Sequence, residues 1–104
     1  MAATPESKVK KRVRSLLDAA GAYHFMPPAN GYGRAGVPDI VGCFHGRFFA
    51  VECKAGYNKT TPLQDRELEA INRTGGAAFV IREDTLDLLE GWLNENRNSQ
   101  GQEP

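Results

Sequence analysis

The chain has 104 residues, of which 40% are hydrophobic and 25% are charged, and this length and composition are typical of one globular domain. Its two cysteines are too few for a disulfide framework or for a zinc site of four cysteines. No apolar run approaches the roughly 20 residues of a membrane span, and the N-terminus lacks the apolar stretch of a signal peptide. We therefore expect a protein of a reducing cytoplasm that has no membrane partner.

The formal net charge of zero hides an uneven distribution along the chain. Residues 1–60 contain nine Lys/Arg and four Asp/Glu, whereas residues 61–104 contain four and nine. Five of the positive charges fall within residues 8–14, KVKKRVR. Concentrated positive charge favours a polyanionic partner, because neutralising phosphates releases counterions. A solvated helix face explains the same segment equally well, and both interpretations stay open.

The first predicted element is a helix that begins at Thr4-Pro5-Glu6. The threonine is a candidate N-cap, the proline suits the first turn, and the acid favours the positive end of the helix dipole. Apolar residues recur at helical spacing up to Ala20, and Gly21 ends the segment. Residues 22–28, AYHFMPP, then suit a short strand ended by prolines, and the glycine-rich residues 30–38 suit a loop.

Residues 39–54, DIVGCFHGRFFAVECK, are the most strand-like part of the chain, with two β-rich runs around His45-Gly46. The second run has apolar side chains on both alternating faces, which indicates a central hairpin covered on both sides. Cys53 lies between Glu52 and Lys54, so its side chain faces the opposite side of the sheet, where we expect a core residue.

The remaining elements are a helix, a strand and a helix. A capping-box pattern at residues 61–64, TPLQ, predicts a helix that ends at Gly75-Gly76. Residues 77–82 are predicted to form a strand, and Asp84 is the candidate N-cap of the last helix. The order α-β-β-β-α-β-α predicts a single α/β domain over residues 1–96, built on a mixed sheet with helices on both faces. Residues 97–104 are predicted to be a disordered tail.

The hairpin brings together side chains that can carry chemistry. If its turn lies at His45-Gly46, Asp39 lies directly across from Glu52 with Cβ atoms roughly 5 Å apart, and Lys54 projects from the same face. Two adjacent carboxylates repel each other unless one is protonated, a lysine pairs with them or a cation binds. Oxygen ligands at this spacing suit Mg²⁺ or Mn²⁺, which can activate water for attack on a phosphodiester. A solvated ion-pair cluster without chemistry is the alternative that the spacing leaves open.

The residues around this hairpin resemble a known nuclease motif. Gly36-Val37-Pro38-Asp39, with Glu52-Cys53-Lys54 beginning thirteen residues after Asp39, resembles the motif of the PD-(D/E)XK nucleases. Within them, residues 4–93 resemble the VRR-NUC group, which includes small stand-alone phage and bacterial proteins. The resemblance implies a restriction-endonuclease-like αβββαβ core, with a mixed sheet flanked by helices. It also implies divalent-metal hydrolysis of phosphodiester bonds that leaves a 5′-phosphate, in the cytoplasm of a bacterial or phage-infected cell.

The resemblance assigns roles to two residues outside the hairpin. Glu6 matches an acid on the first helix of the group and would join Asp39 and Glu52 as a metal-site residue, although the helix dipole explains it locally. Gln64 matches a glutamine on the helix after the lysine strand, although the capping box explains it locally. For the stand-alone members, the resemblance further implies a homodimer that cuts branched DNA such as four-way (Holliday) junctions.

Candidate DNA contacts come from the first helix and from the two loops that flank the hairpin. The loop residues are placed to grip a backbone or to stack on an exposed base, and a plain surface role is the alternative for each. Tyr57, in the loop after Lys54, carries the same two interpretations. The candidate DNA-contacting residues are Lys8, Lys10, Lys11, Arg14, Asn30, Tyr32, Arg34 and Lys59.

The prediction is a metal-dependent, structure-selective DNA endonuclease. Two alternatives stay open: an exonuclease or non-selective nuclease that acts in phage replication or recombination, and a DNA-binding module that keeps the fold without catalysis. The intact hairpin acids and lysine argue against the second alternative. The predicted catalytic residues are Asp39, Glu52, Lys54, Glu6 and Gln64.

Overall fold

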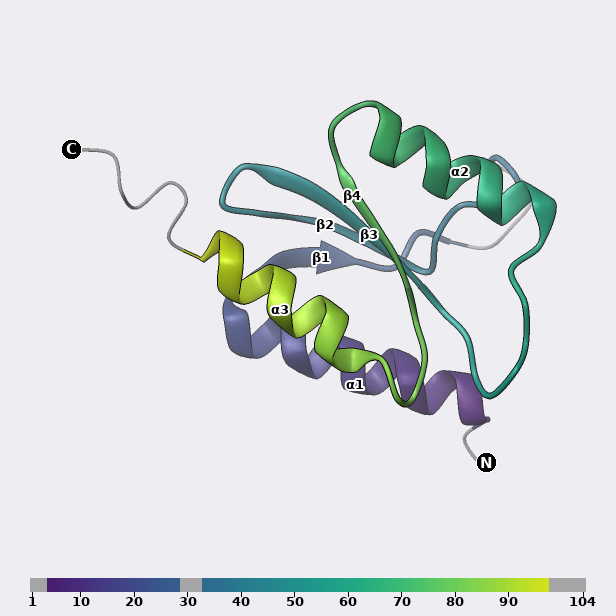
Figure 1. The fold of residues 1–104 in the computed structure, drawn as a ribbon, viewed down its shortest axis with the longest axis horizontal. Coiled ribbons are helices and arrows are strands. Elements are labelled where there is room, and N and C mark those ends of the chain that lie inside the picture. The colour runs from purple at the N-terminus through teal and green to yellow at the C-terminus, as the bar shows by residue number, and fades with distance from the viewer. Residues whose placement is uncertain (1–3, 29–32, 98–104) are drawn as a thin grey trace.

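A computed structural model of the chain describes residues 4–28 and 33–97. Figure 1 shows α1 and α3 side by side along one side of a sheet, and α2 along the other. No helix within the described ranges is long and apolar enough to cross a membrane. The elements in chain order are α1 (Pro5–Ala20), β1 (Tyr23–Phe25), β2 (Ile40–Phe44), β3 (Arg47–Cys53), α2 (Pro62–Arg73), β4 (Ala77–Ile81) and α3 (Leu86–Asn96).

The sheet is mixed, as predicted. Its strand order is β1-β2-β3-β4, with antiparallel pairing of β1 with β2 and of β2 with β3, and parallel pairing of β3 with β4. The parallel pair is joined through α2, which is the crossover that a parallel connection requires. β3 is therefore a central strand, and its residues from Phe49 to Cys53 are buried.

The predicted register of the hairpin is confirmed. Ile40 pairs with Val51 and Phe44 with Arg47, so the turn lies at His45-Gly46. Both turn residues have positive φ, 50° and 82°, as the tight turns that join two antiparallel strands require. One step beyond the Ile40–Val51 pair, the chain bends at Asp39 while β3 continues through Glu52.

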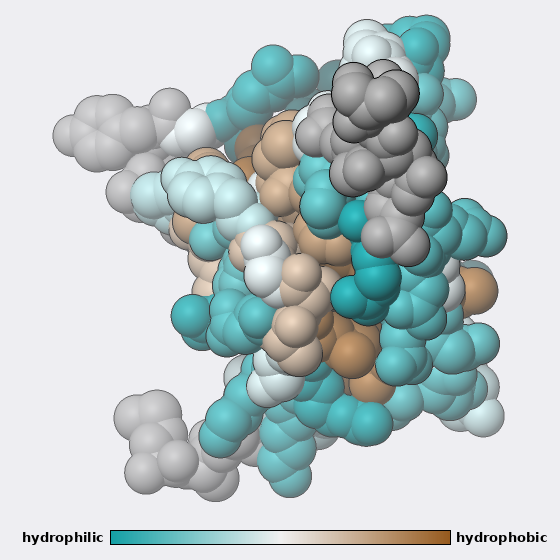
Figure 2. Space-filling model, turned by 90° about the vertical axis from the view of Figure 1, so that its left-hand side faces the viewer, coloured by the Kyte–Doolittle hydropathy of each residue, from teal (hydrophilic) through white to brown (hydrophobic). Residues whose placement is uncertain are grey.

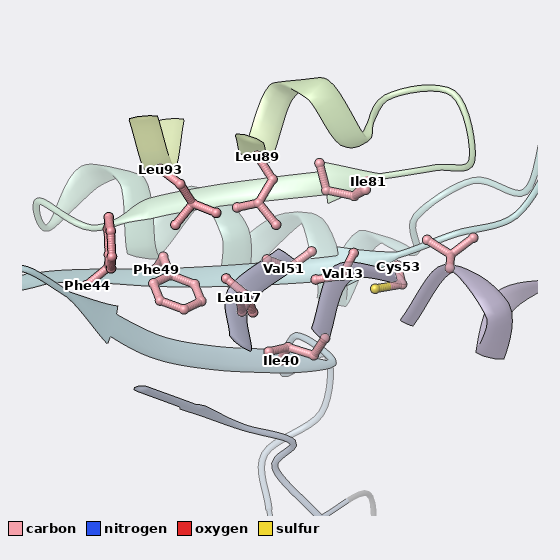
Figure 3. Close-up of a cluster of buried hydrophobic side chains, with 11 residues drawn as sticks. Val13, Leu17, Ile40, Phe44, Phe49, Val51, Cys53, Ile81, Leu89 and Leu93 are labelled. Atoms are coloured by element: carbon pink, nitrogen blue, oxygen red, sulfur yellow. The ribbon is translucent and has the colours of Figure 1, made fainter. Parts of the chain in front are cut away.

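The main core fills the space between α1, α3 and one face of the sheet (Figure 3). Alternating residues of β3 supply its floor, because the side chains of Phe49, Val51 and Cys53 all point to this face. Cys53 is fully buried there, as predicted. The helices contribute Val9, Val13 and Leu17 from α1 and Leu89 and Leu93 from α3.

The N-caps predicted from the sequence are confirmed for two of the three helices. The Ser7 N–H donates to Oγ1 of Thr4, which caps α1, and Thr61 and Gln64 form the capping box of α2. The prediction that Asp84 caps α3 is wrong. Thr85 is the N-cap, but its side chain does not cap the helix. Its Oγ1 instead accepts from the Arg82 N–H at 2.8 Å, in the turn before α3. Of the predicted tail, only Arg97 lies within the described residues.

Candidate active site

Three carboxylates from three separate elements converge at one end of the sheet. Glu6 lies in the first turn of α1, Asp39 in the bend before β2, and Glu52 in β3. One carboxylate oxygen of each lies within 4.8 Å of the others. The fold thus brings together the three residues that were predicted as metal ligands. Hard oxygen donors at this separation match the coordination chemistry of Mg²⁺ and Mn²⁺.

A backbone hydrogen bond fixes Asp39. The Cys53 N–H donates to Oδ2 of Asp39 at 2.9 Å, and Oδ1 lies 3.7 Å from Nζ of Lys10. Since the side chain of Cys53 is anchored in the core, the donor cannot shift without disturbing β3. The carboxylate of Asp39 is therefore held by the fold, with its side chain still 21% exposed.

Glu52 is a buried acid without enough partners. Its residue is 2% exposed, Oε2 lies 3.6 Å from Nζ of Lys54, and Oε1 has no hydrogen-bond partner within the described part of the chain. Burial and the neighbouring Asp39 carboxylate raise the pKa of Glu52 to about 7. A buried, unsatisfied carboxylate oxygen is costly, and a bound cation would satisfy it.

Two lysines supply positive charge beside the acids. Lys54 follows β3, where its N–H donates to the Ile81 carbonyl at 3.0 Å and extends the parallel pairing. Its residue is only 9% exposed. Lys10 was predicted only as a DNA contact, and its contact with Asp39 was missed. Glu6 and Lys10 are four residues apart on one helix, so the i, i+4 spacing indicates that they share a face, but it does not place Asp39 beside them.

The loop before Asp39 packs against the start of α2. Gly36 has φ 84°, and a Cβ at this position would lie 2.4 Å from the Leu63 carbonyl oxygen, so only glycine fits. Gln64 lies in the same turn of α2, where its Oε1 accepts from the Thr61 N–H at 2.9 Å. The side chain of Gln64 is thus engaged in the capping box, and its catalytic role stays a prediction.

The basic residues of α1 form a stripe that leads to the acids. One hollow of about 560 Å³ is lined by Ser7, Lys8, Lys10, Lys11 and Arg14. Four of these residues, Ser7, Lys10, Lys11 and Arg14, recur at i, i+3, i+4 and i+7, so they lie along one side of the helix. Arg12 points elsewhere and lines a hollow with residues of α3. The five cations therefore do not all share one face of α1, but four of them, Lys8, Lys10, Lys11 and Arg14, line the same hollow.

Two further hollows flank the acids, and Lys10 belongs to both. One, of about 620 Å³, includes Asp39, Arg34 and the loop between them. The other, of about 690 Å³, includes Glu6, Tyr57 and Glu83. Arg34 is exposed and pairs with Glu67 at 2.9 Å.

The structure places the remaining predicted DNA contacts only in part. Lys59 is exposed in the segment that precedes α2. Asn30 and Tyr32 lie outside the described residues.

Known proteins resemble this chain in sequence and in fold. No protein-family model matches the chain. A protein named "Putative nuclease p44", from Acyrthosiphon pisum secondary endosymbiont phage 1, is 37% identical over 86 residues, which cover 80% of this chain and 86% of that protein. A solved structure named "VRR_NUC domain protein" superimposes with a TM-score of 0.65 and 21% identity, covering 91% of this chain and 89% of that one. This structural likeness confirms the predicted fold.

Proposed function

This chain belongs to the nuclease family of the phage protein p44 and has the VRR-NUC fold, and we propose that it is a divalent-metal-dependent DNA endonuclease. Its substrate in this proposal is branched DNA such as a four-way junction, cut to leave a 5′-phosphate in the cytoplasm of a bacterial or phage-infected cell. The observation that carries the proposal is the convergence of Glu6, Asp39 and Glu52 beside two lysines.

The residues present fit a hard divalent cation. Three carboxylates offer oxygens within 4.8 Å of one another, and Oε1 of Glu52 is buried without a partner. In the proposal, these three acids hold Mg²⁺ or Mn²⁺. When bound, such an ion supplies Lewis-acid polarisation of the phosphoryl group and a water of lowered pKa.

Groups of the protein itself position the acids and stabilise the charge on the phosphate. The Cys53 N–H holds Asp39 in place through Oδ2, so its second oxygen, Oδ1, keeps its position near Nζ of Lys10. Lys54, close to Oε2 of Glu52, is placed to stabilise negative charge that develops on the phosphate. Because Lys54 is almost buried, its ammonium acts in surroundings where charge interactions are stronger than in water.

The basic stripe of α1 supports DNA as the substrate. Lys10, Lys11 and Arg14 lie along one hollow, and Lys10 also borders both hollows beside the acids. A backbone that follows the stripe would reach the acid cluster at Lys10. Phosphate contacts of this kind position DNA without reading its sequence, which suits an enzyme that selects structure.

An uncovered part of the sheet supports a homodimer. Tyr23, Phe25 and Phe48 are 68%, 48% and 45% exposed, and strand pairing sets Cys43 between Tyr23 and Phe48 on the face that α2 leaves open. Figure 2, viewed from the side of the hairpin turn, shows hydrophobic surface through the middle of the molecule between hydrophilic borders. A twofold dimer of this kind would match the twofold symmetry of a junction.

A cleavage assay with two substrates tests the proposed function. We expect the protein to cut a four-way junction in Mn²⁺ or Mg²⁺, to leave the matched linear duplex intact, and to lose all cleavage in EDTA. Cleavage of both substrates would favour a non-selective nuclease or exonuclease, and binding without cleavage would favour a non-catalytic module. Asp39→Asn and Lys54→Ala should each abolish cleavage in a folded protein, and activity in either variant would remove that residue from the mechanism.

A further inference from the structure

The loop that follows Lys54 presents one aromatic side chain entirely to solvent. Tyr57 is 100% exposed, so its ring contributes nothing to the packing of the described chain. Single exposed apolar residues are common on protein surfaces and need no explanation on their own. The exposure of Tyr57 carries an argument only together with the loop that holds it and the site beside it.

Hydrogen bonds hold the backbone of the loop on both sides of Tyr57. The Gly56 N–H donates to both carboxylate oxygens of Glu83, at 3.0 and 3.1 Å. The Arg82 guanidinium donates to the carbonyls of Gly56 and Asn58, at 3.0 and 2.6 Å. These bonds tie the loop to the end of β4, so the backbone that carries Tyr57 is fixed while its ring is free.

Tyr57 shares a hollow with one residue of the acid cluster. Tyr57 borders the hollow of about 690 Å³ that Glu6 and Lys10 also border. It follows Lys54 by three residues, and Lys54 contacts Glu52. A nucleotide adjoining a phosphate at the acids would therefore lie within the reach of this loop.

We propose that Tyr57 is a base-stacking site for a nucleotide whose base has an open face, next to the phosphate that the acid cluster cuts. Bases within a duplex have both faces covered by their neighbours, whereas the last base before a branch, flap or gap has an open face. An aromatic side chain on a preorganised loop binds such a face at little entropic cost, whatever the base. The site selects interrupted DNA over continuous duplex, and in this respect it rests on the proposed function.

The test uses DNA with 2-aminopurine at the unpaired position of a flap, because emission of this adenine analogue is quenched when it stacks. Ca²⁺ replaces Mn²⁺ during binding, and a continuous duplex serves as the second substrate. We expect Tyr57→Ala to bind the flap about 5- to 150-fold more weakly and to lose the quench. Affinity for the duplex should change less than twofold, and Tyr57→Phe should keep both the affinity and the quench.

Leu88→Ala is the matched control, since Leu88 is another exposed apolar residue, on α3. The stacking site is overturned if Tyr57→Ala binds the flap as the unchanged protein does, or if its loss is equal on flap and duplex. Failure of the nuclease proposal gives a different pattern: the unchanged protein quenches the flap probe but cuts no DNA in Mn²⁺. A protein that binds neither DNA would overturn both.

Discussion

Nζ of Lys54 lies 3.6 Å from Oε2 of Glu52, while Oε1 of the same carboxylate has no partner within the described chain. One ammonium thus compensates only part of the cost of burying this acid. Burial and the neighbouring Asp39 carboxylate raise the pKa of Glu52 from 4.5 to about 7. The acid cluster is therefore a place where the fold gives up stability, as functional sites commonly do.

The stability of the metal-free protein should depend on pH through Glu52. Between pH 4.5 and 7, the folded protein keeps a proton on Glu52 that the unfolded chain releases. The folded state then binds more protons, so the free energy of unfolding falls as the pH rises through this window. At about 1.4 kcal/mol per pKa unit, the loss is on the order of 3 kcal/mol. Thermal melts from pH 4 to 8 in EDTA measure it.

Glu52→Gln is the decisive variant for this pH dependence, because glutamine is neutral in both states. We expect it to melt at a higher temperature than the unchanged protein at pH 8, and to lose the stabilisation that Mn²⁺ gives the unchanged protein. Glu69→Gln, which replaces an exposed carboxylate on α2, should melt like the unchanged protein at every pH. Identical pH profiles for the Glu52 and Glu69 variants would contradict the prediction.

The hairpin half of the site could be predicted from sequence because strand pairing is a local, periodic constraint. Once the turn lies at His45-Gly46, pairing of Ile40 with Val51 follows, and Asp39 must meet Glu52. No such local constraint places Glu6 beside these two acids. It depends on how Val9 and Val13 seat α1 on the sheet, so residue spacing alone could not place it, and only the family resemblance did.

Contacts that form only in the folded backbone account for what the sequence did not reveal. The fit of Gly36 depends on the carbonyl of Leu63, 27 positions along the chain, which no local pattern encodes. The cap of α3 was misassigned because Asp84 and Thr85 are both good N-cap residues, and only the turn at Arg82 decides between them. Lys10 was predicted as a DNA contact, but its approach to Asp39 requires the packed helix.

Gly36→Ala should damage the site through the backbone. The new Cβ would lie 2.4 Å from the Leu63 carbonyl oxygen at a φ of 84°, so the loop before Asp39 must move. We expect a loss of about 1–3 kcal/mol in the free energy of unfolding and a large loss of cleavage. Gly91→Ala is the matched control: Gly91 is in α3 with nothing within 4 Å of a Cβ, and alanine should stabilise the helix by about 0.5–1 kcal/mol. Urea denaturation compares them, and equal stability of the two variants would refute the fit of Gly36.

Arg14→Ala should weaken DNA binding and flatten its dependence on salt. Arg14 lines the basic hollow with Lys10 and Lys11, and the loss of one phosphate contact reduces the slope of log K against log salt by about 1. Arg12→Ala removes the same charge from the neighbouring face of α1, beside Leu86 and Glu90, and should leave the slope unchanged. Fluorescence anisotropy at several salt concentrations measures both. Equal slopes for the two variants would mean that the stripe is only a solvated helix face.

Phe48→Glu should separate the proposed dimer. Phe48 is 45% exposed beside Cys43 on the open face of the sheet, and a charge there would have to be buried against the second copy. We expect sedimentation velocity to give a dimer for the unchanged protein and a monomer for Phe48→Glu. Leu88→Glu, which changes an exposed side chain of α3, should remain a dimer. A monomer carries one acid cluster, so this variant should nick junctions without resolving them. A dimer that survives Phe48→Glu but dissociates with Leu88→Glu would move the interface to α3.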